Sequence, residues 1–220
     1  MTKDVLTHSA DGTVSSLAKI CLESSLRYLE SSQSWKENTF LPEDICEALI
    51  CKKLKTGSCD DNFVATYFAD IRTSRITKVH VSGATLTDSG LGMLSVHPLR
   101  DVDVSNCESM SEKAIMCLVN CKNTLTSLNL GNCSRINAFT ELQQLTGLKL
   151  LDVSETLLDQ MDFECLSTLV RLRSLNVSAT KIMSLEPVKT MTLLTNLDLS
   201  ECLFLDSIEP LKTLKGYAIF

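Results

Sequence analysis

The chain has 220 residues, of which 44% are hydrophobic and 22% are charged, a composition that excludes wholesale disorder and fits a globular protein of about one domain. The 21 basic and 27 acidic side chains give a formal net charge of −6, which disfavours recognition of a nucleic-acid backbone. Aromatic residues make up only 5%, so we expect an aliphatic core.

Residues 1–13 are mostly polar and lack the apolar stretch of a secretory signal. No later window approaches the roughly 20 apolar residues that a membrane-spanning helix needs. We therefore expect a flexible amino terminus, no membrane contact, and a soluble protein of the cytoplasm, the nucleus or both. In such a reducing compartment the ten cysteines are expected to be free thiols.

Residues 14–75 have the pattern of a helical module. Over residues 15–34, apolar side chains recur at the spacing of a helix. A second helix is predicted over residues 35–55, because Pro42 suits a first turn, acidic residues follow it, and lysines stand at the carboxyl end. A module of this kind serves as the cap that the first unit of a repeat protein needs.

From residue 76 onward, six segments share one pattern, with apolar residues at relative positions 1, 4 and 6. Their first residues, 22 to 26 positions apart, are Ile76, Leu99, Leu125, Leu148, Leu172 and Leu194. The alternation predicts short strands, and the spacing is typical of leucine-rich repeats. We therefore expect an α/β leucine-rich repeat solenoid of about six repeats over residues 76–220, with a parallel sheet on its concave side. Pro187 and Pro210 favour short 3₁₀ or one-turn helices on the convex side.

The residue between two buried positions of each strand is expected to point toward the concave surface. This central column is polar and consists of His80, Asp103, Asn129, Asp152, Asn176 and Asp198. Two interpretations stand: the column binds a partner protein, or Asp and Asn simply hydrate well at this position. In either case Asp152 faces solvent, so replacing it by Ala is expected to change stability little.

No pattern in the chain indicates catalysis, a metal or a cofactor. The nucleophile elbow, the phosphate-binding loop and the dinucleotide fingerprint are all missing. Cys117 and Cys121 have the spacing of a helical metal pair, but no C-x-x-C pair accompanies them, and His80 and His97 lie in other repeats. We favour structural thiols and expect a protein that is not an enzyme and that binds other proteins.

A first short motif lies in the predicted helix over residues 15–34. Ser16-Leu17-x-x-x-Cys21 resembles the elongin C-binding box, with Ser25 where that box has an aliphatic residue. The resemblance implies that Leu17 and Cys21 contact elongin C.

A second motif, Leu41-Pro42-x-x-Ile45-x-x-x-Leu49, resembles the cullin-2 box, and the resemblance implies that these four residues contact cullin-2. The two boxes in this order, followed by leucine-rich repeats, resemble the amino-terminal half of the Zyg-11/Zer-1 family of cullin-2 ubiquitin-ligase substrate receptors. The resemblance is closer to the Zer-1 branch.

This family resemblance implies an adaptor of a cullin-2–elongin B/C ubiquitin ligase, with a VHL-box-like module at residues 14–75 and repeats that bind an unidentified protein substrate. Two alternatives remain open. The segment that begins at Leu41 also resembles the start of an F-box, which would bind Skp1. A leucine-rich repeat scaffold with no link to a ligase would use the same repeats for protein binding.

Overall fold

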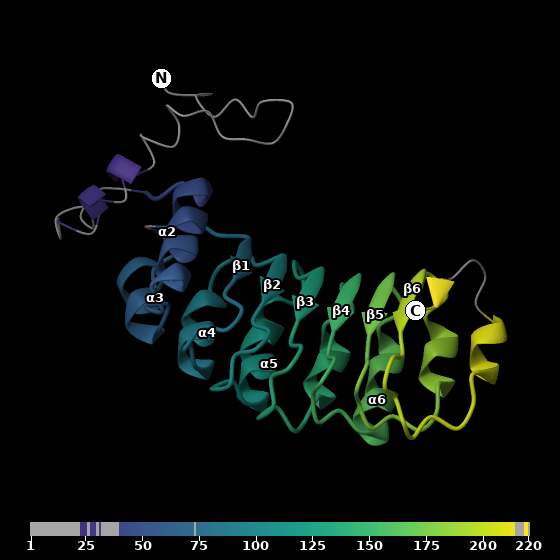
Figure 1. Cartoon of the computed structure of the whole chain (residues 1–220). Helices are drawn as coiled ribbons and strands as arrows, with labels where there is room; N and C mark the ends of the chain where they lie inside the picture. The colour runs from purple at the N-terminus through teal and green to yellow at the C-terminus, as the bar shows by residue number, and fades with distance from the viewer. Residues whose placement is uncertain are drawn as a thin grey trace.

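The computed structural model describes residues 23–25, 27–29, 31, 40–72, 74–213 and 218–219. Within them, short parallel strands stack in chain order into one sheet of seven strands (Figure 1). The strands are β1 (Lys78–His80), β2 (Asp101–Asp103), β3 (Ser127–Asn129), β4 (Leu150–Asp152), β5 (Ser174–Asn176), β6 (Asn196–Asp198) and β7 (Ala218–Ile219). The predicted leucine-rich repeat solenoid is confirmed, and β7 extends its sheet beyond the six predicted repeats.

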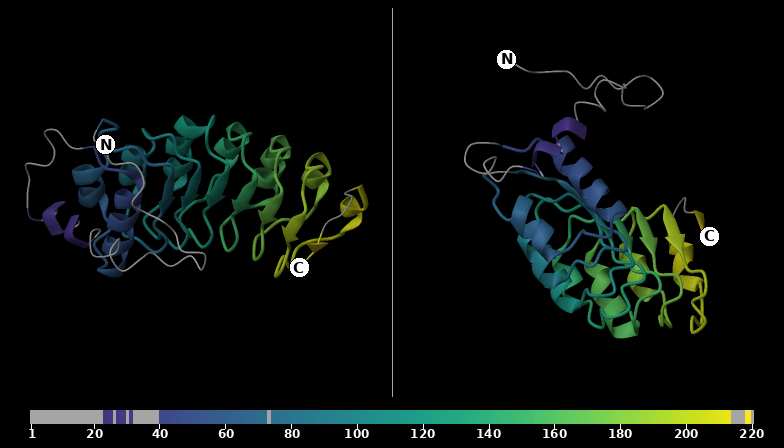
Figure 2. Two further views of the ribbon diagram at one scale, coloured as in Figure 1. Left: turned by 90° about the horizontal axis from the view of Figure 1, so that it is seen from above. Right: turned by 60° about the vertical axis from the view of Figure 1, so that its left-hand side comes forward.

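Helical turns return the chain along the other side of the core, as Figure 2 shows from above. The α-helices on this convex side are α4 (Asp88–Leu94), α5 (Glu112–Leu118) and α6 (Gln160–Cys165). The 3₁₀ helices are η2 (Val119–Cys121), η3 (Thr140–Gln144), η4 (Leu166–Thr168), η5 (Glu186–Thr190) and η6 (Glu209–Thr213). The two helices that contain Pro187 and Pro210 are 3₁₀ helices, as predicted.

The repeat register follows the apolar pattern of the sequence. The buried residue at the centre of each strand pairs with its equivalent in the next strand, and the column is Val79, Val102, Leu128, Leu151, Leu175 and Leu197. Each of these side chains is at most 2% exposed. Because full burial of one such side chain contributes about 1.5–3 kcal/mol, the stacked columns fix the register.

A turn follows each of the first six strands. The residue at the eighth position of the repeat lies in this turn and has a left-handed backbone conformation. Positive φ angles between 52° and 70° occur at Gly83, Asn106, Asn132, Glu155, Ala179 and Glu201. The ninth residue then binds a backbone carbonyl: the thiol of Cys133 donates to the Val104 oxygen at 3.1 Å, and the hydroxyl of Thr180 donates to the Val177 oxygen at 2.6 Å. The Cys133 bond crosses to the preceding repeat, whereas the Thr180 bond stays within its own repeat.

A helical cap covers the first strand. It contains α2 (Glu43–Lys55) and α3 (Asp61–Tyr67), and the side chain of Asp60 caps α3 by accepting a hydrogen bond from the Phe63 amide. Its buried residues belong to the same apolar cluster as the repeat residues. Glu43, in the first turn of α2, accepts a hydrogen bond from the Thr77 amide at 2.8 Å, which ties the helix to the segment that leads into β1. The cap and the repeats thus share one core.

Candidate functional site

The structure aligns the six predicted residues of the concave column. Pairing of neighbouring strands sets His80 beside Asp103, and the column continues through Asn129, Asp152, Asn176 and Asp198. His80 is exposed, whereas the other five are half-buried. The sequence therefore predicted correctly that these residues share one face, while partner binding by the column stays a prediction.

Five residues of this column also stabilise the turn that follows their own strand. The side-chain oxygen of Asp103 accepts a hydrogen bond from the Ser105 amide at 3.0 Å, and Asn129 accepts one from the Gly131 amide at 2.9 Å. The same contact, at 2.9–3.0 Å, recurs at Asp152, Asn176 and Asp198. Asp and Asn form such bonds to the backbone two residues onward, so the fold alone gives a reason for their presence.

Asp152 lies on the concave face, as predicted, but its side chain is also held by hydrogen bonds that the sequence analysis did not predict. One of its carboxylate oxygens accepts hydrogen bonds from the amide and the hydroxyl of Ser154, at 2.9 and 2.6 Å. The other oxygen accepts from the side-chain amide of Asn176 at 2.9 Å. Asp152 therefore links two neighbouring repeats, because both of its oxygens are engaged.

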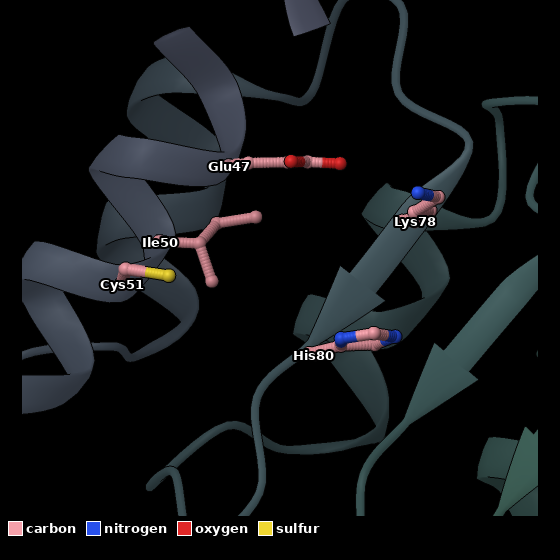
Figure 3. A pocket seen from close by; sticks show the side chains of 5 residues that line it. All are labelled: Glu47, Ile50, Cys51, Lys78 and His80. Atoms are coloured by element: carbon pink, nitrogen blue, oxygen red, sulfur yellow. The ribbon is translucent and has the colours of Figure 1, made fainter. Parts of the chain in front are cut away.

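A hollow of about 170 Å³ lies where α2 meets β1, at the cap end of the concave face (Figure 3). Glu47 and Ile50 of α2 point toward β1, which presents Lys78 and His80 on the opposite wall. The imidazole Nε2 of His80 lies 2.9 Å from a carboxylate oxygen of Asp101 on β2. Glu47 thus faces Lys78 and His80 across the hollow, which the apolar side chain of Ile50 also lines.

The sequence did not predict this hollow, because its walls come from a helix and a strand that only the packing of the cap brings together. Exposed Cys51 also lines it. Within the described part of the chain, no three histidine, cysteine or acidic side chains are grouped so that they could hold a metal ion.

The residues predicted to bind cullin-2 divide into two groups. Leu41 is 2% exposed and Leu49 is fully buried, and both pack in the core of the cap. The expectation that these two contact a partner is therefore corrected, since their side chains are already enclosed by the chain itself. Pro42 is exposed and Ile45 is half-buried, so these two remain available at the start of α2.

The residues predicted to bind elongin C, Leu17 and Cys21, lie outside the residues that the structure describes. Ser25, at the position where the elongin box has an aliphatic residue, is described and exposed. The proposed contacts of the elongin box stay predictions.

The buried thiols of the described chain are structural. Desolvation by burial raises the pKa of Cys46 to about 12 and that of Cys59 and Cys133 to about 11. A thiol with a raised pKa stays protonated at neutral pH and is a poor nucleophile and metal ligand. These groups act as small apolar side chains and as weak hydrogen-bond donors, as in the bond from Cys46 to the Leu41 carbonyl at 3.7 Å.

One apolar residue of the concave face also escaped the sequence analysis. Leu150, at the exposed start of β4, is 47% exposed and stands beside Ser127 and Ser174 on the neighbouring strands. The position just before Leu150 carries Lys149, and the equivalent position of the next repeat carries Arg173. Both basic residues are exposed. An exposed leucine next to basic residues offers a small apolar contact on an otherwise polar surface.

No family model matches the chain. It is 28% identical to the zer-1 homologs of Homo sapiens and Mus musculus over 141 residues, which cover 58% of this chain and 18% of the relative. A probable disease resistance protein of Arabidopsis thaliana is 33% identical over 98 residues, which cover 44% of this chain and 8% of that protein. The chain thus spans about a fifth of the length of the zer-1 homologs.

Two solved structures of Listeria monocytogenes internalins share the fold. InlF has a TM-score of 0.57 at 22% identity, over 69% of this chain and 42% of its own. Internalin C2 has a TM-score of 0.56 at 20% identity, over 67% of this chain and 68% of its own. In the described residues, no helix is long and apolar enough to cross a membrane. The predicted resemblance is confirmed: the chain is a leucine-rich repeat protein that is similar in sequence to the Zer-1 proteins.

Proposed function

We propose that the chain is an adaptor of a cullin-2–elongin B/C ubiquitin ligase, which recruits a protein substrate through its leucine-rich repeats. The observation that carries the proposal is the order of the two box motifs ahead of repeats that are similar to those of the zer-1 homologs. The protein acts by binding, in the cytoplasm or the nucleus, and another subunit supplies the catalysis.

The cullin contact in this proposal is confined to Pro42 and Ile45. Their side chains stand at the start of α2 and keep exposed surface, whereas Leu41 and Leu49 anchor the same helix in the core. The first turn of α2 is tied to Thr77 through Glu43, and it leaves Pro42 and part of Ile45 exposed at the start of the helix. A rigid helix whose apolar residues protrude from one turn suits recognition by a groove in a partner.

Substrate binding is assigned to the concave face. The central column supplies carboxylates and amides, the neighbouring column supplies exposed Arg100, Lys149 and Arg173, and Leu150 supplies an apolar contact. A protein surface with both acidic and basic groups would complement this arrangement. The repeats hold these residues on strands, so little ordering entropy is lost when a partner binds.

Co-purification tests the proposal. The tagged 220-residue chain should retain elongins B and C when the three are co-expressed, and should then bind cullin-2. Leu17→Ser combined with Cys21→Ser should abolish both interactions, because elongin C bridges the chain to the cullin in this arrangement. Pro42→Ala combined with Ile45→Ala should leave elongins bound and weaken cullin-2 binding, since truncation of interface anchors removes most of their affinity.

A control variant and a competing partner make this test decisive. Lys55→Ala changes an exposed residue at the opposite end of α2, so it should bind both partners like the parent. All variants should melt near the parent temperature if the exchanged side chains serve an interface. Retention of Skp1 in place of the elongins would favour the F-box alternative, because LPEDICEAL begins at Leu41. Retention of neither would favour a repeat scaffold with no ligase link.

A further inference from the structure

Repeats four to six carry several exposed apolar side chains after the turns that follow their strands. We call this set the edge patch: its members are between 44% and 86% exposed, and they are Leu157, Met161, Met183, Leu203, Phe204 and Ile208. Their neighbours Leu158 and Ile182 are fully buried, so the patch is distinct from the core. Exposed apolar groups that gather in one place mark binding sites on soluble proteins.

Three members of the edge patch line a shallow hollow of about 320 Å³. Met161, Met183 and Phe204 come from three successive repeats, and they meet there with Asp159, Gln160 and Lys181. Methionine adapts its shape to a partner, and phenylalanine supplies a large contact area. The hollow therefore has the composition of a protein-binding groove that crosses the repeats.

The backbone beneath the hollow is held in place. The Lys181 amide donates to the Leu158 carbonyl at 3.0 Å, and the Asp206 amide donates to the Met183 carbonyl at 3.1 Å. The side chain of Gln160 accepts hydrogen bonds from the amides of Met183 and Ser184, both at 2.9 Å. These bonds join the three repeats, so the apolar side chains project from a preorganised support.

The spacing of the three repeats matches that of a helix. Neighbouring strands lie about 4.8 Å apart, and the patch follows them from repeat to repeat. An α-helix advances about 5.4 Å per turn, so its side chains at positions i, i+3 or i+4, and i+7 are separated by nearly the same distance. A helix laid across the repeats would therefore place one apolar side chain against each repeat.

The charged residues near the edge patch indicate which polar side chains such a helix should carry. Within two residues of the patch members stand six acidic side chains, against Lys181 as the basic one. Five of them are exposed, Glu155, Asp159, Glu201, Asp206 and Glu209, and the last is paired with Lys212 at 2.6 Å. The sixth, Asp162, is half-buried and accepts a hydrogen bond from the Phe139 amide at 3.0 Å. Exposed carboxylates around an apolar groove attract a partner with basic flanks.

We propose that the edge patch binds a basic amphipathic helix of a partner protein, with the helix lying across repeats four to six. This site is separate from the concave column and from the start of α2, and it does not depend on a link to a ubiquitin ligase. Apolar side chains on one stripe of the helix occupy the hollow, and lysines or arginines beside that stripe meet the surrounding carboxylates.

A synthetic peptide provides the probe. A fluorescein-labelled peptide of about 14 residues, with leucine at every third or fourth position and lysine elsewhere, spans roughly 20 Å as a helix. Fluorescence anisotropy should show saturable binding to the 220-residue chain at low salt, and affinity should fall as salt rises. A peptide of equal composition with its leucines spread around the helix should bind at least tenfold more weakly, as should a peptide with glutamate in place of lysine.

Substitutions in the patch locate the site. Met183→Ser combined with Phe204→Ser should weaken binding of the first peptide at least tenfold, because both lose buried contact area. Met161→Lys, at a side chain that is 78% exposed, should weaken it without altering the fold. Met116→Ser, at a side chain on α5 that is 57% exposed, is the control and should bind like the parent.

Three outcomes would overturn the proposal. The first is equal binding of a control peptide: for the spread-leucine peptide it would show that the apolar stripe does not matter, and for the glutamate peptide that the charge does not. The second is unchanged binding of the first peptide by both Met161→Lys and the combined Met183→Ser and Phe204→Ser variant. The third is self-association of the chain, measured by sedimentation and abolished by Met161→Lys, which would identify a second copy as the occupant.

Discussion

Asp152 lies on the concave face, and both of its carboxylate oxygens accept hydrogen bonds, from Ser154 and from Asn176. Asp152→Ala removes the acceptor for the Ser154 amide and for an amide of the neighbouring repeat. We expect a loss of about 1.5–3 kcal/mol in the free energy of unfolding, as for other hydrogen bonds to charged groups. Urea unfolding followed by circular dichroism measures this loss.

Lys149→Ala is the control for Asp152→Ala. Lys149 lies three residues earlier, is exposed, and should change the free energy of unfolding by about 0.5 kcal/mol or less. If Asp152→Ala is as stable as this control, the hydrogen bonds of Asp152 do not contribute to the free energy of unfolding. The prediction would then be wrong.

His97 predicts a pH dependence of stability. It is buried, and its Nε2 atom lies 2.6 Å from the Phe68 carbonyl, to which the neutral ring donates. Among the described residues its Nδ1 atom has no hydrogen-bond partner. Desolvation by burial lowers the pKa of His97 below the ordinary value for histidine, against the opposing effects of the Phe68 bond and of Asp70.

The sign follows from this lowered pKa. As pH falls below about 6.5, the unfolded chain takes up a proton at His97 that the folded chain refuses, so stability decreases until the folded pKa is reached. His97→Gln keeps a donor for Phe68 and removes the titration. Melting temperatures from pH 8 to pH 5 should fall more steeply for the parent than for this variant, and parallel curves would contradict the assignment.

At the scale of one repeat, the turn after the strand governs which residues are tolerated. Gly83 and Ala179 occupy the same left-handed position, with φ of 70° and 52°. A side chain in this conformation costs roughly 1–2 kcal/mol, and glycine avoids most of that cost. Ala179→Gly should therefore raise the free energy of unfolding, and Gly83→Ala should lower it by about 1 kcal/mol.

The two substitutions test the same backbone property in opposite directions. A Cβ atom added at Gly83 has nothing within 4 Å, so steric contact does not complicate its interpretation. Chemical denaturation of both variants gives the measurement. If Ala179→Gly is less stable than the parent, the greater flexibility of glycine in the unfolded chain outweighs the relief of backbone strain in the folded chain.

The strands of the repeats could be predicted because each carries apolar residues at fixed positions, and a shift by one residue would expose all of them. The helix α2 could be predicted from Pro42 and from its charged ends. Burial of Leu41 and Leu49 could not, because an apolar stripe has the same pattern whether it faces a core or a partner. The hydrogen bonds of Asp152 could not either, since they join residues that only the stacking of repeats brings together.

At the scale of the whole molecule, the cap and the repeats form one apolar cluster. The change in composition predicted a boundary between them at residue 75. No pattern in the sequence predicted the hydrogen bond from the Thr77 amide to Glu43, which crosses that boundary. The hollow between α2 and β1 follows from this docking. In the adaptor proposed above, this shared core would hold a cullin bound at the start of α2 in a fixed orientation to a substrate on the concave face.

Burial weakens toward the carboxyl end of the solenoid. In the fifth repeat Val177 and Ile182 are fully buried, whereas their equivalents in the sixth, Leu199 and Leu205, are only partly buried. Local opening costs less free energy where fewer apolar contacts must break. In the 220-residue chain, amide hydrogen exchange measured by mass spectrometry should therefore be faster from residue 194 onward than in β3 and β4. Equal protection from β3 through β6 would show that pairing with β7 suffices to close the end of the solenoid, and that the whole repeat array opens as a single cooperative unit.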